Sequence, residues 1–219
     1  MKMAELKNIA VYGAGGFGRE VACTINKINE IEPTWNLVGF FDDGVEKGKI
    51  VSHFGPVLGG MQELNAWQSK INVVVAIGNP NTVKKVVEKI DNANVEFPNL
   101  IHPDVACSDK ETFSIGKGNI VQTCCRFSCD VKVGNFNVLN SSVVLGHDVS
   151  IGDFNSMMPG VRISGEVTMG DCNFFGVNSV VLQQIKIKSN VRLAAGSVLM
   201  TKPKENSLYL GVPAKLVKV

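Results

Sequence analysis

The chain has 219 residues, of which 45% are hydrophobic and 19% charged, and its 22 basic and 20 acidic side chains give a net charge of +2. This composition is typical of a folded globular protein, and the lack of a basic tract argues against nucleic acid as a partner. The six cysteines and three histidines have no zinc-type spacing, so we expect reduced thiols and no metal. No apolar segment is long enough for a signal or a membrane span, which predicts a cytoplasmic protein with no membrane insertion.

The first predicted unit is a strand, a glycine turn and a helix. Residues 8–12 are apolar, residues 13–18 read GAGGFG, and a helix is expected to run to about Asn29. The glycines permit a tight turn, and the start of the following helix presents backbone N–H groups to an anion.

The next elements extend this pattern. An apolar strand over residues 37–41 ends in Asp42 and Asp43, and another over residues 71–77 precedes an amphipathic helix near residues 83–90. The alternation predicts a small α/β layer with a parallel sheet. Residues 46–61 are rich in glycine and are expected to form a loop.

A glycine turn of this kind is weak evidence by itself. One interpretation is an NAD-dependent enzyme with Asp42 on the ribose hydroxyls, although about 100 residues are too few for the doubled mononucleotide unit. Another is that the glycines only permit close packing of helix on strand. The residues alone leave both open.

The second half of the chain carries a repeat of six residues. An apolar side chain recurs without a break at residues 115, 121, 127, 133, 139, 145, 151, 157, 163, 169, 175, 181, 187, 193 and 199. This period fits neither a helix nor one long strand, but it fits short strands joined by turns. Three such strands close one triangular coil of a β-helix.

Two ladders with a period of eighteen residues support this coil. Glycine recurs at residues 116, 134, 152 and 170, and asparagine at residues 119, 137, 155 and 173. Residues eighteen apart would stack about 4.8 Å apart, the spacing of paired strands. Stacked asparagines can then hydrogen-bond amide to amide close to the core.

These hexads, the segment Ala194–Leu199 (AAGSVL) and the ending Gly211–Lys215 (GVPAK) resemble the left-handed β-helix acyltransferases. With its N-terminal half, the chain resembles the bacterial sugar acetyltransferases that include nucleotide-aminosugar N-acetyltransferases and sialic acid O-acetyltransferases. The resemblance, and not the period, implies the left hand. It also implies a Rossmann-like nucleotide-sugar domain over residues 1–102, an acetyl-CoA domain over residues 103–219, and a homotrimer.

The resemblance also implies a set of substrate contacts in the N-terminal half. They are Gly13, Gly15, Gly16, Phe17, Asp42, Asp43 and Gly78. Many N-acetyltransferase members carry histidine at the position of Phe17, which leaves the nucleotide open.

Acyl transfer needs a base that works near neutral pH, most simply a histidine. His53 is expected on the surface and His102 as a packed or capping residue, whereas His147 falls on a predicted turn and points outward. The resemblance implies that His147 is the general base. It implies that Asp148 orients the imidazole, which requires the turn to break strand alternation. It also implies that Gly165, one coil further on, offers its N–H to the oxyanion.

The resemblance places the coenzyme on four positions, Ser156, Gly165, Val177 and Ala195. Many relatives have histidine at the position of Ser156. Cys124 and Cys125 are expected to fill the wall of the coil and not to form an acyl-enzyme.

Together these features predict transfer of an acetyl group from acetyl-CoA to the amino group of a nucleotide-linked amino sugar. One alternative is O-acetylation of sialic acid, another sugar or serine, which would use the same base and oxyanion donor. A second alternative, of a different class, is a non-enzymatic β-solenoid that serves as a binding module.

Overall fold

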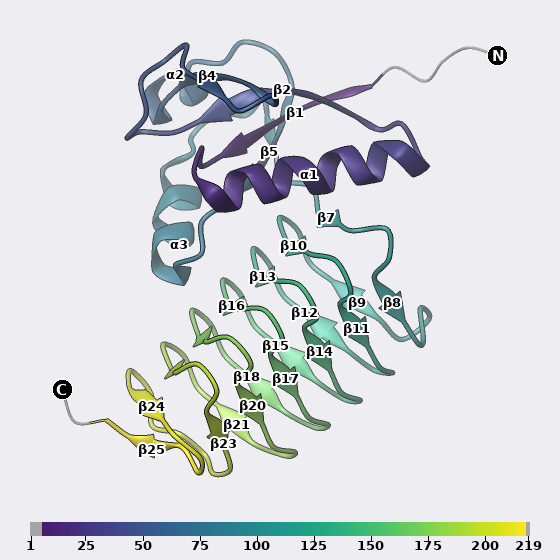
Figure 1. Ribbon diagram of the computed structural model, residues 1–219, viewed down its shortest axis with the longest axis vertical. Coiled ribbons are helices and arrows are strands. Elements are labelled where there is room, and N and C mark those ends of the chain that lie inside the picture. Colours follow the sequence, from purple (N-terminus) through teal and green to yellow (C-terminus); the bar gives the residue numbers. More distant parts are fainter. Residues whose placement is uncertain (1–5, 218–219) are drawn as a thin grey trace.

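The computed structural model describes residues 6–217 and has an α/β layer stacked on a triangular β-solenoid (Figure 1). The α/β layer has a sheet in the order β3-β4-β2-β1-β5-β6. Its elements are β1 (Lys7–Tyr12), α1 (Gly16–Ile31), β2 (Trp35–Phe41), β3 (Ile50–Val51), β4 (Gly55–Gly59), α2 (Met61–Asn65), β5 (Ile71–Val75), α3 (Pro80–Lys89) and β6 (Val95–Glu96). Strands β1, β2 and β5 pair in parallel, as predicted, and β4 and β6, which were not predicted, extend the parallel sheet at its two sides.

The segment 46–61 differs from the expected loop. Strands β3 and β4 form an antiparallel hairpin, and β4 pairs in parallel with β2. Gly55 and Gly59 bound β4 with φ angles of +137° and +140°, so these glycines serve turns at the ends of a strand. A glycine-rich composition does not distinguish such a strand from a loop.

The solenoid has three sheets, which we call I, II and III. Sheet I contains β7 (Leu100–Ile101), β10 (Ile120–Val121), β13 (Val138–Leu139), β16 (Ser156–Met157), β19 (Phe174–Phe175), β22 (Arg192–Leu193), β24 (Leu208–Leu210) and β25 (Lys215–Leu216). Sheet II contains β8 (Ala106–Cys107), β11 (Arg126–Phe127), β14 (Val144–Leu145), β17 (Arg162–Ile163), β20 (Val180–Val181) and β23 (Val198–Leu199). Sheet III contains β9 (Ser114–Ile115), β12 (Lys132–Val133), β15 (Ser150–Ile151), β18 (Thr168–Met169) and β21 (Lys186–Ile187).

The predicted register of eighteen residues is confirmed. Leu145 pairs with Ile163, and Ile151 pairs with Met169. The apolar residues at every sixth position from 121 to 199 are all buried, and Ile115 is partly buried. Strand β7 pairs with β10 of sheet I, so a solenoid strand lies just before the division predicted between residues 102 and 103. The domain boundary stays a prediction.

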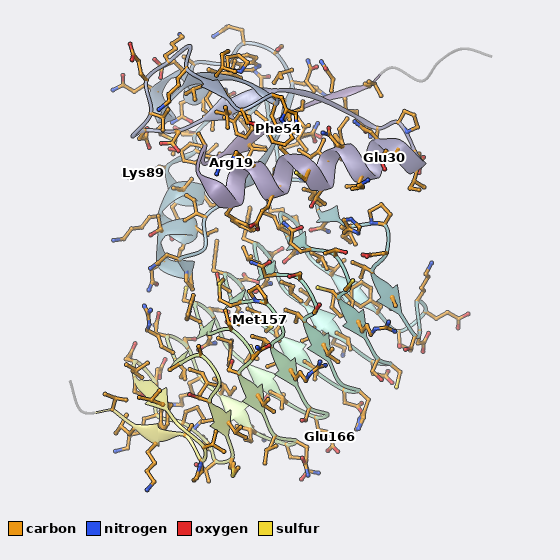
Figure 2. All side chains as sticks on the ribbon, in the orientation of Figure 1. Arg19, Glu30, Phe54, Lys89, Met157 and Glu166 are labelled. Atoms are coloured by element: carbon orange, nitrogen blue, oxygen red, sulfur yellow. The ribbon has the colours of Figure 1, made fainter. Side chains whose placement is uncertain are left out.

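From Gly118 to Gly196, each corner of the coil turns on a residue with positive φ. These residues recur every six positions, as at Ser142 (φ +62°) and Asp148 (φ +57°). The left-handed conformation reverses the direction of the chain and ends the alternation of side chains. Figure 2 shows the result, with Met157 inside the coils and Glu166 on their outer margin.

The asparagine ladder forms as predicted. The Asn137 Nδ2 donates to Asn119 Oδ1 over 3.0 Å, and the Asn155 Nδ2 donates to Asn137 Oδ1 over 3.1 Å. The backbone N–H of each upper asparagine donates to the same oxygen. Because these residues are buried, the ladder satisfies polar groups that water cannot reach.

The α/β layer covers sheet I. Helix α1 lies between its own sheet and the solenoid (Figure 1), and its buried Val21 and Ile25 join a cluster that contains Leu100 and Ile120. Helix α3 packs its Val83 beside Phe136 in a second cluster. Sheets II and III are left on the other two sides of the prism.

Candidate active site

The glycine turn between β1 and α1 contains glycines that the fold requires. Gly13 has φ +115°, and a Cβ there would lie 2.7 Å from the carbonyl oxygen of Ala76. A Cβ on Gly18 would collide with the Gly13 carbonyl. Gly13 is required by its close approach to the segment that follows β5, and Gly18 by the close approach of α1 to the glycine turn.

Other glycines of the turn are not explained by packing. A Cβ at Gly15, Gly16 or Gly78 would meet no heavy atom within 4 Å. Gly15 is the N-cap of α1 with φ −77° and no side-chain cap, so an alanine would fit there. An uncapped helix start that is bare of side chains suits an anionic ligand close to the backbone.

Asp42 and Asp43 hold the neighbouring loops. Asp42 Oδ2 accepts from the Ala14 N–H and its Oδ1 from the Gly44 N–H, each over 2.8 Å. Asp43 accepts from the Tyr12 hydroxyl over 2.5 Å. Burial and this carboxylate raise the pKa of Tyr12 well above its usual value. Both aspartates border a hollow of about 310 Å³, where their remaining lone pairs face solvent.

Two basic side chains beside the turn were not among the predicted contacts. Arg19 and Lys49 line a second hollow of about 310 Å³ with Ala14 and Ser52, and Arg19 lies near the start of α1 (Figure 2). Lys49 could not be found because its hairpin was expected to be a loop. Phe17, by contrast, is half-buried and packs against the core cluster of α1.

His147 lies on the corner between sheets II and III, the II/III corner. Its Nδ1 is 2.8 Å from Asp148 Oδ2, and both side chains are more than half exposed. The positive φ of Asp148 lets neighbouring residues point the same way. This is the break in alternation that the predicted pairing requires.

Gly165 lies one coil beyond His147 and receives its ring. A Cβ on Gly165 would be 2.5 Å from His147 Nε2, so only glycine leaves room for the imidazole. Among the backbone hydrogen bonds of residues 6–217, none uses the Gly165 N–H, whereas the following Glu166 N–H donates to the His147 carbonyl. The structure thus brings together an imidazole, a carboxylate and an open amide.

The predicted coenzyme positions are spread over the solenoid. Val177 and the exposed Ala195 stack eighteen residues apart on the corner between sheets I and II, the I/II corner. Ser156 is not with them. It is 1% exposed on sheet I, the side that the α/β layer covers, so its burial disagrees with the predicted coenzyme contact.

The remaining histidines and cysteines divide by burial. His53 is exposed against Phe54, as expected, and His102 bonds to Asp104 in a turn. Cys125 is buried, which raises the pKa of its thiol to about 12. Cys124 is exposed with φ +60°, so its assignment as wall filler is wrong. It occupies the outward corner position, where the coil reverses.

Comparison with known proteins agrees with this architecture. Residues 8–90 match the PglD N-terminal domain. The acetyltransferase domain of PglB from Neisseria gonorrhoeae, solved with acetyl coenzyme A, is 27% identical with a TM-score of 0.87, over 97% of this chain and 100% of that one. No curated protein matches the sequence.

Two further structures show the same fold. A variant of perosamine N-acetyltransferase from Caulobacter crescentus, solved with CoA and GDP-perosamine, is 22% identical with a TM-score of 0.86, over 98% of this chain and 99% of that one. WeeI from Acinetobacter baumannii is 23% identical with a TM-score of 0.85, over 96% and 100%.

The solenoid and these matches identify this protein as an acyl-CoA-dependent acyltransferase of the hexapeptide-repeat class, with the predicted Rossmann-like domain and left-handed β-helix. Within that class it is a PglD/NeuD-like sugar acyltransferase. Among the described residues, no helix has the length and apolar character needed to cross a membrane.

Proposed function

We propose that this protein transfers an acetyl group from acetyl-CoA to the amino group of a nucleotide-linked amino sugar, and that it does so in the cytoplasm. The observation that carries the proposal is the His147 imidazole lying against Gly165, beside Asp148. The neighbours solved with acetyl coenzyme A, or with CoA and GDP-perosamine, support the two substrates.

His147 acts as the general base. Its Nδ1–H donates to the Asp148 carboxylate, which leaves Nε2 unprotonated and able to accept a proton from the acceptor amine. Asp148 keeps the ring in this tautomer and stabilises the imidazolium that forms. Transfer is direct, with both substrates bound together and no acyl-enzyme. The amine nitrogen bonds to the carbonyl carbon, and the tetrahedral adduct then breaks its C–S bond and expels the CoA thiolate, which takes up the proton held by the His147 imidazolium.

Gly165 stabilises the developing negative charge. As the amine attacks the thioester carbonyl, the open Gly165 N–H donates to the carbonyl oxygen. One such hydrogen-bond donor typically lowers the activation free energy by about 3 kcal/mol. The amide is fixed by the coil, because the Gly165 carbonyl accepts from the Gln184 N–H, so little reorganisation is needed.

The position of the α/β layer supports a site shared between subunits. The layer covers sheet I, while His147 lies on the opposite corner of the prism. Sheet III shows mainly polar residues to solvent, and sheet II is more apolar, with Val144, Val180 and Val198 half-buried on its outer side. We propose that sheet II packs near its copies in a homotrimer, so that a sugar held by one subunit meets His147 of the next.

A thiol-release assay tests the proposed function. The protein is given acetyl-CoA with a panel of UDP-, dTDP- and GDP-linked amino sugars, and with free sialic acid and serine. Release of CoA with at least one nucleotide-linked amino sugar is the expected result. Release with sialic acid or serine alone contradicts N-acetylation in favour of O-acetylation, and no release with any acceptor contradicts both.

A further inference from the structure

One cleft of the described chain lies away from both the glycine turn and the His147 corner. Its volume is about 390 Å³, and it opens between α1 and the start of the I/II corner. One wall is the middle of α1, including Glu20, Thr24 and Lys27, and the other wall belongs to the first solenoid coils. Nothing in the proposed mechanism uses these residues.

His102, which lines this cleft, forms a second histidine–aspartate pair with Asp104. The Nδ1 of His102 is 2.6 Å from Asp104 Oδ1. Asp104 also accepts from the Thr123 hydroxyl and the Cys124 N–H. Burial raises the pKa of Asp104, but hydrogen bonds from Thr123, Cys124 and His102 outweigh it and lower the pKa to about 2. The carboxylate is therefore ionised and fixed.

This arrangement leaves one nitrogen of His102 for a ligand. Because Nδ1–H donates to a carboxylate, Nε2 is the acceptor nitrogen of the neutral ring. The hydrogen bonds of His102 within residues 6–217 all use its Nδ1 or backbone. The side chain keeps 17% of its surface exposed and lines the cleft.

Gln122 stands next to His102 in the neighbouring coil. Ile101 pairs with Val121, so the residues that follow them stack about 4.8 Å apart. Thr24 of α1 donates to Gln122 Oε1 over 2.7 Å, while the buried Nε2 of Gln122 has no partner in the described chain. The amide thus ties the helix to the solenoid and gives the cleft a fixed polar floor.

The charge and position of the cleft fit one class of ligand. Glu20 lines the cleft, and Lys27 is paired with Glu30. The Asp104 carboxylate behind His102 is ionised, so the cleft lacks the positive charge that a phosphate needs. Polar groups that pair with hydroxyls then favour a neutral polyhydroxylated ring over a phosphate. Glu20 follows Gly16 by four residues, about 6 Å along the helix. A sugar linked to a diphosphate at the helix start can reach this far.

We infer that this cleft binds the sugar ring of the acceptor, with His102 Nε2 accepting a hydrogen bond from a ring hydroxyl. The inference rests on the proposed function and adds a specificity-determining residue to it. His102 selects and positions the sugar, while proton removal is left to His147.

Two substitutions separate this role from a structural one. His102→Asn places an amide donor near the Nδ1 position for Asp104 and removes the acceptor at Nε2, whereas His102→Gln extends an amide toward the Nε2 position. Both are compared with His53→Ala, a change on the exposed hairpin. Thermal unfolding midpoints close to that of the wild type show that each variant is folded.

Calorimetry gives a readout that does not depend on turnover. For each protein, affinity is measured for the nucleotide-linked amino sugar and for the bare nucleoside diphosphate. We expect His102→Asn to lower the affinity for the sugar-linked ligand about tenfold and to leave the affinities for the bare nucleotide and acetyl-CoA unchanged. His102→Gln should recover part of the lost affinity. An acceptor that lacks the contacted hydroxyl should bind wild type and variant alike.

For folded His102→Asn, the inference is overturned by equal losses of affinity for the bare nucleotide and the sugar-linked ligand, or by unchanged affinity for both. A wild-type protein that binds the sugar no better than the bare nucleotide also overturns it. Failure of the proposed function looks different, because the sugar-linked ligand then binds in a His102-dependent way with no release of CoA.

Discussion

The imidazole of His147 lies over Gly165 of the next coil, where a methyl group would stand 2.5 Å from Nε2. The eighteen-residue register places these two residues one above the other, between the paired strands β14 and β17 and the paired strands β15 and β18. A base and an unpaired backbone amide are thereby held on one corner by the solenoid itself. Five predictions follow from this corner and from the architecture around it.

Replacing His147 with alanine removes the proposed base. We expect kcat to fall by about 10²- to 10⁴-fold, with the affinity for CoA nearly unchanged, because the imidazole acts on the acceptor amine. Steady-state kinetics and a CoA titration measure the two quantities. His53→Ala is the control, and near-normal turnover of His147→Ala would rule out the assignment.

Replacing Asp148 tests the orientation of the ring. Asp148→Asn should lower kcat roughly tenfold or more, because an amide can donate to Nδ1 and favour the wrong tautomer. Asp148→Glu keeps the charge and should retain more activity. The same rates for the two variants would show that the carboxylate does not act through His147.

Replacing Gly165 with alanine tests the contact between the two coils. The added methyl displaces the imidazole, so kcat should fall by about 10²-fold or more. If the methyl group acts by displacing the ring, the kcat of the double variant with His147→Ala should be little lower than that of His147→Ala alone. Fully additive losses, measured by the same CoA-release assay, would show that the methyl acts elsewhere.

Substitutions at two glycines of the turn distinguish an effect on folding from an effect on ligand binding. Gly13→Ala forces a side chain to φ +115° against the Ala76 carbonyl and should destabilise the fold by about 1–3 kcal/mol. Gly15→Ala has room and a φ of −77°, so it should cost only about 0.5–1 kcal/mol, the difference between glycine and alanine at an N-cap. It should nevertheless weaken nucleotide-sugar binding. Denaturant unfolding and calorimetry check both, and unchanged affinity in Gly15→Ala would place the nucleotide elsewhere.

The asparagine ladder predicts a stability effect distant from the site. Asn137→Ala removes the oxygen that accepts from the Asn155 N–H and side-chain amide, and it leaves these buried donors unpaired. A loss of about 2–3 kcal/mol in the free energy of unfolding is expected. Asn36→Ala is the matched control, because Asn36 is exposed and donates to Asn8 Oδ1. This change should lower the free energy of unfolding by under about 0.5 kcal/mol. Equal losses at both positions would count against the ladder.

Much of the solenoid was predictable because its geometry is local and repeated. Each hexad has the same inward position and the same left-handed corner, so the residue number gives the coil and the face. His147, Asp148 and Gly165 could therefore be placed together from their spacing. The hairpin of β3 and β4 could not, because it occurs once and does not repeat, and its two-residue and five-residue strands leave almost no periodic signal.

Other parts of the site depended on how the two halves pack. Ser156 has the spacing of an outward residue on sheet I, and nothing in its hexad shows that this sheet is covered. The cleft at His102 exists only because α1 lies across the first coils, where Thr24 meets Gln122 at a separation of 98 residues. Arg19 and Lys49 meet beside the glycine turn only after the β3–β4 hairpin has folded back.

The sequence by itself determined the coil, its register and the stacking of Gly165 on His147, since a six-residue period and strand spacing fix which residues lie one coil apart. The left hand of the coil was implied by the family resemblance. Only the tertiary structure decided which face of the prism the α/β layer covers, and so which polar residues are buried and which line a cleft. The physical reason is that burial of the apolar faces of α1, α3 and sheet I depends on contacts between distant segments, which no local period records.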